Sequence, residues 1–340
     1  MRVAITGSSG LIGSALAADF QRDGTTVIRL VRRSPREPGE IAWNPRDPRG
    51  GLDPAALDGL DGVVHLSGAP IAGRLWTKAR KAELRSSRIQ STKALVTAIG
   101  KTANPPSVLL SGSAIGWYGD TGTREVDESA PAGTGFLAHL VRDWEAAARP
   151  ASQAGVRVAN LRSGVVLSRK GGMLGPLVPL FRLGLGARIG PGTQFISWIS
   201  LTDHVAAVRF LLDHADIEGP VNLTAPVPAT NTEFTSELAR VLRRPALLRV
   251  PAPALRAGLG ELSGELLGST RVLPRRLQEA GFAFRYPGIA GALAAEALAG
   301  TAERFDVLAR LPQRNFPGGA ALRRPMLALA MLAFRLRDLL

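Results

Sequence analysis

Three glycines near the amino terminus have the spacing of a phosphate-binding loop. Gly7, Gly10 and Gly13 lie in the segment ITGSSGLIG, between an apolar run and a segment with helical periodicity. Glycine allows the tight turn and the close backbone approach that a pyrophosphate needs, and the free N–H groups of the following helix attract an anion. We therefore expect a bound dinucleotide; a tight turn without a ligand is the alternative. The other loop residues predicted to contact the cofactor are Ser9, Leu11 and Ile12.

Two arginines follow the second apolar run, at the position that distinguishes the two nicotinamide dinucleotides. Sites that prefer NAD carry an acidic residue there, which holds the ribose hydroxyls. This chain has Arg32 and Arg33 and no acid. Because guanidinium groups match a 2′-phosphate in charge and geometry, the pair favours NADP (NADPH) over NAD. A solvated basic turn is the alternative.

The segment SGSAIGWYGD, residues 111–120, contains a candidate for proton transfer. Tyr118 is one of only two tyrosines in the chain. A phenol with an ordinary pKa of about 10 needs a nearby cation to exchange a proton at neutral pH. No lysine is obvious close by, so packing beside a bound cofactor is the alternative for Tyr118.

The histidines and one arginine have both structural and chemical interpretations. His65 lies in an apolar run, as is typical of a buried core histidine, while His139 and the pair Asp203-His204 lie at expected helix starts. Arg162 could hold an anionic substrate group or a buried carboxylate. No metal site is expected, because the chain has no cysteine and only four scattered histidines.

Apolar runs alternate with helical segments through the first half of the chain, and these elements must position the candidate residues. The alternation predicts βαβ units, hence an α/β fold with a Rossmann-type doubly wound parallel sheet. Strands are expected at 1–7, 25–33, 61–70, 107–114 and 155–167, and helices at 11–24, 77–100 and 135–152.

The pattern changes near residue 168, which gives three predicted regions. Residues 1–167 form an NADP-binding Rossmann domain, and residues 168–300 form a smaller substrate-binding lobe of the same unit. In this lobe the segment GPVNLTAP is expected to be a strand, and the helix NTEFTSELARVLRR to have Asn231 or Thr232 as its N-cap. Residues 301–340 combine a linker with an apolar, basic helix that could dock on the body, contact a second copy in a homodimer, or lie at a membrane surface.

The composition is that of an ordinary globular protein and excludes several classes of function. The chain has 340 residues, 45% of them apolar, and no cysteine, so disulfides and thiolate catalysis are excluded. No window approaches the roughly 20 apolar residues that span a bilayer, and no signal peptide is evident, so we expect a cytoplasmic protein. The net charge of +14 is spread along the chain, which favours a generally basic protein over nucleic-acid binding.

Several segments taken together resemble one family. The chain is similar to the extended short-chain dehydrogenase/reductase superfamily, in its atypical branch of epimerase family proteins, which is related to the nucleotide-sugar epimerases. The similar segments run in order from residue 5 to about residue 287: TGSSGLIGSAL, VVHLSGAPI, WTKARKAELRSSRIQST, SGSAIGWYGD, FLAHLVRDWEAAA, LRSGVVLSRKGGML, SWISLTDHV, GPVNLTAPVPATNTEF and LPRRLQEAGFAFRYP.

The resemblance implies further contacts with the cofactor. Glu83 and Arg88 match positions that relatives present to it; they lie about 140° apart on a helix, so each needs its own partner. A surface helix with charge pairs one turn apart is the alternative for both. The remaining residues implied by the resemblance are Leu66, Ser67, Gly68, Ser111 and Val165.

One feature of the superfamily is missing from this chain. Reductases and epimerases of this type use Tyr-x-x-x-Lys on the helix after the fifth strand, where the lysine lowers the tyrosine pKa. Aligning FLAHLVRDWE with that helix places Leu137 and Val141 in the two positions, with Glu145 one turn further on. Ser113 occupies the position of the serine that orients the substrate. The candidate catalytic residues are therefore Ser113 and Tyr118.

Two functions remain open from the sequence. The first is hydride transfer or epimerisation on a small or nucleotide-linked carbonyl or hydroxyl compound, with NADP(H) as the cofactor. The alternative is a dinucleotide sensor or scaffold that binds NADP without turnover, which the missing dyad favours. Nucleic-acid binding rests on net charge alone and is not expected.

Overall fold

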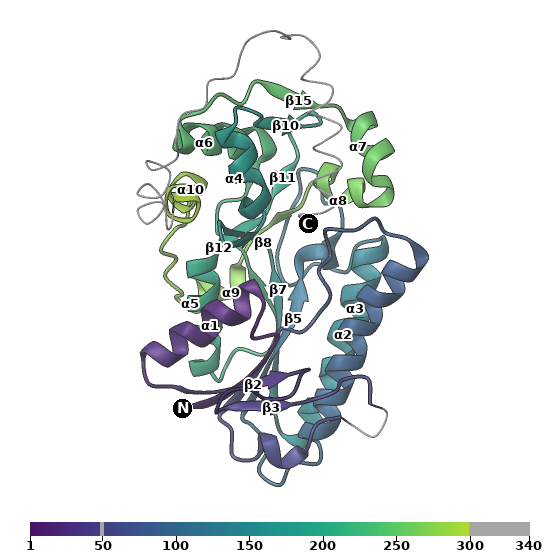
Figure 1. Ribbon diagram of the computed structural model, residues 1–340, viewed down its shortest axis with the longest axis vertical. Coiled ribbons are helices and arrows are strands. Elements are labelled where there is room, and N and C mark those ends of the chain that lie inside the picture. The colour runs from purple at the N-terminus through teal and green to yellow at the C-terminus, as the bar shows by residue number, and fades with distance from the viewer. Residues whose placement is uncertain (48–50, 299–340) are drawn as a thin grey trace.

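A seven-stranded sheet forms the centre of the molecule, and every neighbouring pair of its strands is parallel (Figure 1). The computed structural model describes residues 1–47 and 51–298. The strand order is β13-β7-β5-β4-β1-β2-β3. Parallel strands covered on both faces appear in the sequence as short apolar runs, such as the fully buried GVVH of β4. The strands are β1 (Arg2–Thr6), β2 (Thr26–Val31), β3 (Glu40–Ala42), β4 (Gly62–His65), β5 (Val108–Ala114), β7 (Arg157–Ser163) and β13 (Gly219–Leu223).

Helices cover both faces of this sheet, which confirms the predicted doubly wound fold. On one face, Phe20 of α1 and Leu211 of α5 belong to one buried apolar cluster. On the other face, Leu95 and Ile99 of α2 belong to a second cluster, and α3 packs beside α2. The helices are α1 (Leu11–Arg22), α2 (Lys78–Ile99), α3 (Phe136–Ala148) and α5 (Leu201–Asp213), with 3-10 helices η1 (Pro54–Leu57), η2 (Ile115–Tyr118) and η3 (Arg149–Ala154).

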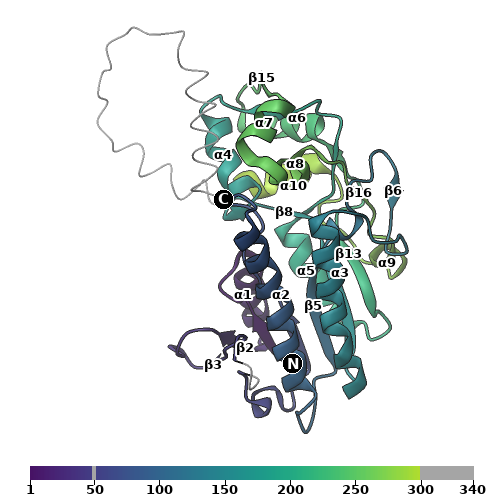
Figure 2. The same cartoon turned by 90° about the vertical axis from the view of Figure 1, so that its right-hand side faces the viewer.

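A smaller lobe lies above the sheet in Figures 1 and 2. Its core includes the buried side chains of Trp198, Phe234 and Leu293. Its strands are short: β8 (Val165–Ser168), β9 (Gly171–Gly172), β10 (Ala187–Ile189), β11 (Phe195–Ile196), β12 (Trp198–Ser200), β14 (Ala229–Thr230), β15 (Leu248–Val250), and β16 (Arg271–Val272), which pairs with β6 (Glu125–Val126). Its helices are α4 (Leu174–Arg182), α6 (Asn231–Leu242), α7 (Ala252–Leu259), η4 (Gly260–Leu262), α8 (Ser263–Leu267) and α10 (Ile289–Leu298). Helix α9 (Arg275–Glu279) instead packs against β13 of the central sheet.

The chain crosses between the sheet and the lobe more than once. The strand predicted at 155–167 is two strands separated by Gly164: β7 belongs to the main sheet, whereas β8 pairs with β12 and β9. The chain then returns, because α5 packs on the sheet and β13 pairs with β7. The Rossmann unit therefore includes residues 201–223, beyond the predicted boundary at 167. Periodicity predicted the strand at β13 but does not indicate which sheet a strand joins.

Helix α6 begins earlier than the sequence analysis predicted. Thr230 is its N-cap: its hydroxyl accepts a hydrogen bond from the backbone N–H of Glu233, and the Glu233 carboxylate accepts one from the backbone N–H of Thr230. This capping box, T-x-x-E, was present in the sequence. Asn231 instead accepts a hydrogen bond from the Ile189 backbone with its side chain.

Within the described residues, no helix has both the length and the apolar character needed to cross a membrane. The predicted C-terminal helix within residues 301–340 lies outside them.

Candidate functional site

The glycine loop joins the end of β1 to the start of α1, as the spacing predicted. Gly7 has a positive φ of 68°, and a Cβ there would lie 2.9 Å from the carbonyl of Leu66. A Cβ on Gly13 would lie 2.3 Å from the carbonyl oxygen of Gly7. Gly10 is the N-cap of α1, and no side chain caps this helix. The first N–H groups of α1 are therefore available to an anion, and Leu11 and Ile12 lie in that first turn.

The loop after β4 lies directly against the glycine loop. Thr6, the last residue of β1, accepts hydrogen bonds on Oγ1 from the backbone N–H groups of Leu66 (3.1 Å) and Ser67 (3.2 Å). Gly68 lies against the side chain of Arg88, where a Cβ would approach Cζ to 3.1 Å. The predicted cofactor residues from β1, β4 and α2 are thus brought together at the carboxyl ends of adjacent parallel strands, where ligands of doubly wound sheets bind.

His65 is a core residue that holds this arrangement, as the apolar run around it suggested. Because Thr6 Oγ1 already accepts two bonds, its hydroxyl proton points to His65 Nδ1, 2.8 Å away. The opposite ring nitrogen, Nε2, then carries the proton and donates to Thr92 Oγ1 at 3.0 Å. Thr92 in turn donates to the carbonyl of Arg88 and accepts from the indole of Trp144. A chain of buried hydrogen bonds therefore links β1, β4, α2 and α3.

Acid should destabilise the protein through His65. Burial lowers the pKa of His65 to about 3, compared with about 6.5 for an exposed histidine. A base whose pKa is lowered by folding stabilises the fold above its unfolded pKa, and this contribution is lost as the pH falls. The free energy of unfolding should therefore decrease from about pH 6.5 towards pH 3. Urea unfolding across this range should show a shallower decrease in His65→Gln, whereas the exposed control His139→Gln should follow the wild type.

Arg88 is a buried cation without a carboxylate partner among the described residues. Its guanidinium donates to the carbonyl oxygens of Ala69 (2.9 Å) and Leu84 (3.3 Å) and lies over the ring of Trp144. Burial, together with the nearby charge of Arg80, lowers the pKa of Arg88 to about 10. Buried charges are normally paired, so this position beside Gly68 suits an anionic ligand.

Glu83 and Arg88 do not pair, as their helical separation predicted. Glu83 is half-buried and forms an ion pair with Arg80 at 2.7 Å, which lowers the pKa of the Glu83 carboxyl. The side chain of Arg80 also donates to the carbonyl of Pro70. Glu83 therefore has the partner expected of a surface helix, which was the alternative to cofactor binding.

The two predicted 2′-phosphate ligands have different surroundings. Arg33 donates to both carboxylate oxygens of Glu40, at 2.7 and 2.6 Å. This contact, with a hydrogen bond from the Arg36 backbone, lowers the pKa of Glu40 to about 2. Arg32 is exposed and forms no ion pair in the described part of the chain. Arg32 is therefore the better placed of the two to receive a phosphate.

The end of β5 carries a buried polar network that the sequence analysis identified only in part. Ser113 donates from Oγ to the carboxylate of Glu145 at 2.6 Å, and Arg162 donates to both oxygens of the same carboxylate, at 2.8 and 3.0 Å. Arg162 also donates to the Tyr118 hydroxyl at 3.0 Å, and Tyr118 donates to Asn222 Oδ1 at 2.7 Å. Of the two interpretations of Arg162, the structure shows the buried carboxylate.

Tyr118 is surrounded in a way that favours packing over proton donation. Its side chain is buried, and burial raises the pKa of Tyr118 to about 12 even though Arg162 opposes that rise. Its hydroxyl is already engaged by Arg162 and Asn222. The sequence suggested no cation beside Tyr118, but the structure places Arg162 there. Arg162 binds the phenol within the core rather than preparing it for proton transfer. Of the aliphatic residues that replace the usual dyad, Val141 is buried and Leu137 packs against Gly116.

The remaining predicted residues lie on several different elements. Ser111 is buried on β5 opposite His65 of β4. Val165 begins β8, just after the end of β7. Ser9 lies exposed in the turn of the glycine loop. Asp203 and His204 lie in the first turn of α5, where Asp203 accepts hydrogen bonds from the backbone of residues 285 and 286, which makes it a structural group.

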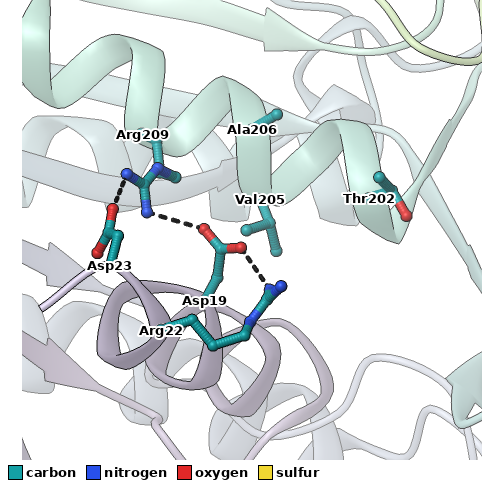
Figure 3. Close-up of a pocket in the computed structure, with 7 residues that line it drawn as sticks. All are labelled: Asp19, Arg22, Asp23, Thr202, Val205, Ala206 and Arg209. Atoms are coloured by element: carbon teal, nitrogen blue, oxygen red, sulfur yellow. Dashed lines mark hydrogen bonds and ion pairs between the residues drawn. The ribbon is translucent and has the colours of Figure 1, made fainter.

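A hollow of about 410 Å³ lies elsewhere, between α1 and α5 (Figure 3). Arg209 crosses it and forms ion pairs with Asp19 and Asp23, while Arg22 also binds Asp19. These charges neutralise one another, and the hollow lies on a helical face of the sheet rather than at the strand ends. We therefore place the candidate site at the glycine loop and the end of β5.

Comparison with known proteins identifies the family of the chain. Residues 3–223 match the model of the NAD dependent epimerase/dehydratase family, and residues 250–296 match a domain of unknown function, DUF1731. An epimerase family protein of Mycobacterium bovis is 50% identical over 292 residues, which cover 86% of this chain and 96% of the relative. The crystal structure of the human epimerase family protein SDR39U1 (isoform 2) with NADPH superimposes with a TM-score of 0.82 at 34% identity, covering 88% of this chain and all of that one.

A second solved structure extends the similarity. The nucleoside-diphosphate sugar epimerase of Corynebacterium glutamicum has a TM-score of 0.72 at 35% identity, covering 99% of this chain and 67% of that one. The matched region includes the glycine loop and the ends of the parallel strands. The chain therefore belongs to the NAD-dependent epimerase/dehydratase family, among its atypical short-chain dehydrogenase/reductase members called epimerase family proteins.

Proposed function

We propose that this protein binds NADP(H) across the ends of β1, β4 and β5 and transfers hydride on a small or nucleotide-linked carbonyl or hydroxyl substrate, as an oxidoreductase or epimerase. The observation that carries the proposal is the uncapped start of α1 beside a loop that excludes a Cβ at Gly7 and Gly13. The NADPH present in the human relative supports the choice of cofactor. When bound, the nicotinamide supplies or accepts the hydride.

The chain's own residues have distinct roles in this proposal. The backbone of the glycine loop and the first turn of α1 bind the pyrophosphate. Arg32 binds the 2′-phosphate, and Arg88 supplies a second cation beside the loop of residues 66–68. Ser113 orients the substrate at the end of β5. Val165 and the loop of residues 66–68 line the sides of the space for the cofactor.

Arg32→Ala should weaken NADPH binding about tenfold and leave NADH binding almost unchanged. In this proposal the exposed guanidinium would contact only the 2′-phosphate, the group that distinguishes the two cofactors, and a charge-assisted hydrogen bond at a solvated site is worth about 1.5 kcal/mol. Arg33→Ala should have a smaller effect, because Glu40 already holds Arg33. Fluorescence titrations of each variant with NADPH and with NADH measure the two affinities. Equal affinity of the wild type for the two cofactors would contradict the assignment of NADP.

A binding protein without turnover is the second candidate function. The apolar residues Leu137 and Val141 at the dyad positions, with the Tyr118 hydroxyl already occupied, favour it. One assay distinguishes the enzyme from the binding protein: NADPH oxidation is followed with a panel of carbonyl compounds. A protein that binds NADPH and never oxidises it is a sensor or scaffold, whereas turnover that Ser113→Ala removes identifies an enzyme.

A further inference from the structure

The polarity of one hydrogen bond decides what Ser113 can offer to a substrate. Glu145 lies on α3, and both of its oxygens receive hydrogen bonds from Arg162, whose side chain is only 2% exposed. A carboxylate held by a guanidinium fork is ionised and can only accept. The 2.6 Å contact with Ser113 is therefore donated by the serine hydroxyl.

The neighbouring groups cannot reverse this polarity. Tyr118, the only other hydroxyl in the network, donates its proton to Asn222 and accepts from Arg162. The Asn222 side chain is fixed by its bond to the carbonyl of Leu273. The hydroxyl proton of Ser113 thus points to Glu145. Only the lone pairs of the Ser113 oxygen are left for a ligand.

We propose that Glu145 is a positioning residue which makes Ser113 an acceptor, so that the substrate presents a hydroxyl group to it rather than a carbonyl oxygen. This inference rests on the proposed function, because it needs Ser113 to lie beside the bound cofactor. Ser113 is the penultimate residue of β5, in the same row of strand ends as the glycine loop after β1 and the loop of residues 66–68 after β4. A carbonyl oxygen placed there would meet another acceptor and be repelled.

The absence of cysteine from the chain allows a test that needs no substrate. In Ser113→Cys, the single thiol faces the Glu145 carboxylate, which disfavours the thiolate. The pKa of this thiol, measured from the pH dependence of its alkylation by iodoacetamide, should lie about one to three pH units above the ordinary value of about 8.5. Adding Glu145→Gln should return it to that value or below, because Arg162 then acts alone. NADPH at saturation should slow the alkylation.

Ser152→Cys is the matched control. Ser152 is exposed in η3, before β7 and hence at the opposite end of the sheet. Its thiol should have an ordinary pKa and alkylate equally with and without NADPH. If the double variant does not fold, the comparison of Ser113→Cys with Ser152→Cys still decides the matter.

Three results would overturn the inference. The first is an ordinary or lowered thiol pKa in Ser113→Cys, and the second is a thiol that never reacts in the native protein. The third is a thiol that NADPH does not protect although fluorescence shows NADPH bound. If fluorescence shows no NADPH binding by the wild type, the proposed function fails instead, so the two failures are distinguishable.

Discussion

Gly13→Ala should reduce NADPH affinity by about a hundredfold while the protein remains folded. The added Cβ would lie 2.3 Å from the carbonyl oxygen of Gly7 and 2.9 Å from Cα of Ser8. Both atoms are backbone, so the glycine loop itself must move, and overpacking of this kind costs about 1–3 kcal/mol. Because the same loop must approach the pyrophosphate, the displacement is expected to act on binding, where each 1.4 kcal/mol is a factor of about ten.

Gly175→Ala provides the control for this prediction. Gly175 lies in α4 of the lobe, and the nearest atom to a Cβ there is 3.9 Å away. Alanine should stabilise the helix by roughly 0.5–1 kcal/mol and leave NADPH binding unchanged. Fluorescence titration gives the affinities and thermal unfolding gives the stabilities. Wild-type affinity in a folded Gly13→Ala protein would contradict the placement of the pyrophosphate at this loop.

Local patterns in the sequence were sufficient to predict the glycine loop and the strands of the central sheet other than β3, which lies in a segment rich in proline and glycine. The glycine spacing and the apolar runs each depend on residues close in the chain, so β1, α1 and β4 could be predicted from them. The assignment of β13 to the main sheet depends on its pairing with β7, some 60 residues away. No short-range pattern carries that information, and the predicted boundary at 167 followed the change in periodicity instead.

The candidate active site was harder to predict, because its contacts join distant parts of the chain. Tyr118 and Asn222 are 104 residues apart, and Ser113 and Glu145 are 32 apart. The resemblance could name Ser113, and the sequence offered Arg162 as a holder of an anionic group or a buried carboxylate, but neither could show that Glu145 connects them. Likewise, Arg32 and Arg33 look equivalent in the sequence, and only the return of the chain at β3 brings Glu40 to Arg33.

The missing dyad changes the electrostatics at the end of β5. A Tyr-x-x-x-Lys pair provides a phenol beside a cation, poised to exchange a proton. Here the cation beside Tyr118 is Arg162, and its charge is neutralised by the ion pair with Glu145. Ser113, one residue before the end of β5, donates to the same carboxylate. Because Ser113 donates its proton to Glu145, its oxygen can accept a hydrogen bond from a substrate hydroxyl but has no proton free to donate.

Arg162→Met should destabilise the fold by about 3–5 kcal/mol, the cost of leaving a buried carboxylate without its partner. Arg162 lies between Glu145 and the ring of Trp117, 3.9 Å from its centroid, and it also binds Tyr118. Combining Arg162→Met with Glu145→Gln removes the stranded charge, so the double variant should recover part of the loss. Arg209→Met is the matched control. The side chains of its partners Asp19 and Asp23 are 23% and 38% exposed beside the hollow of Figure 3, so water screens these pairs more than the buried one and the loss should be smaller. Urea unfolding of the four proteins measures these differences, and equal losses for Arg162→Met and Arg209→Met would show that the buried network does not stabilise the end of β5.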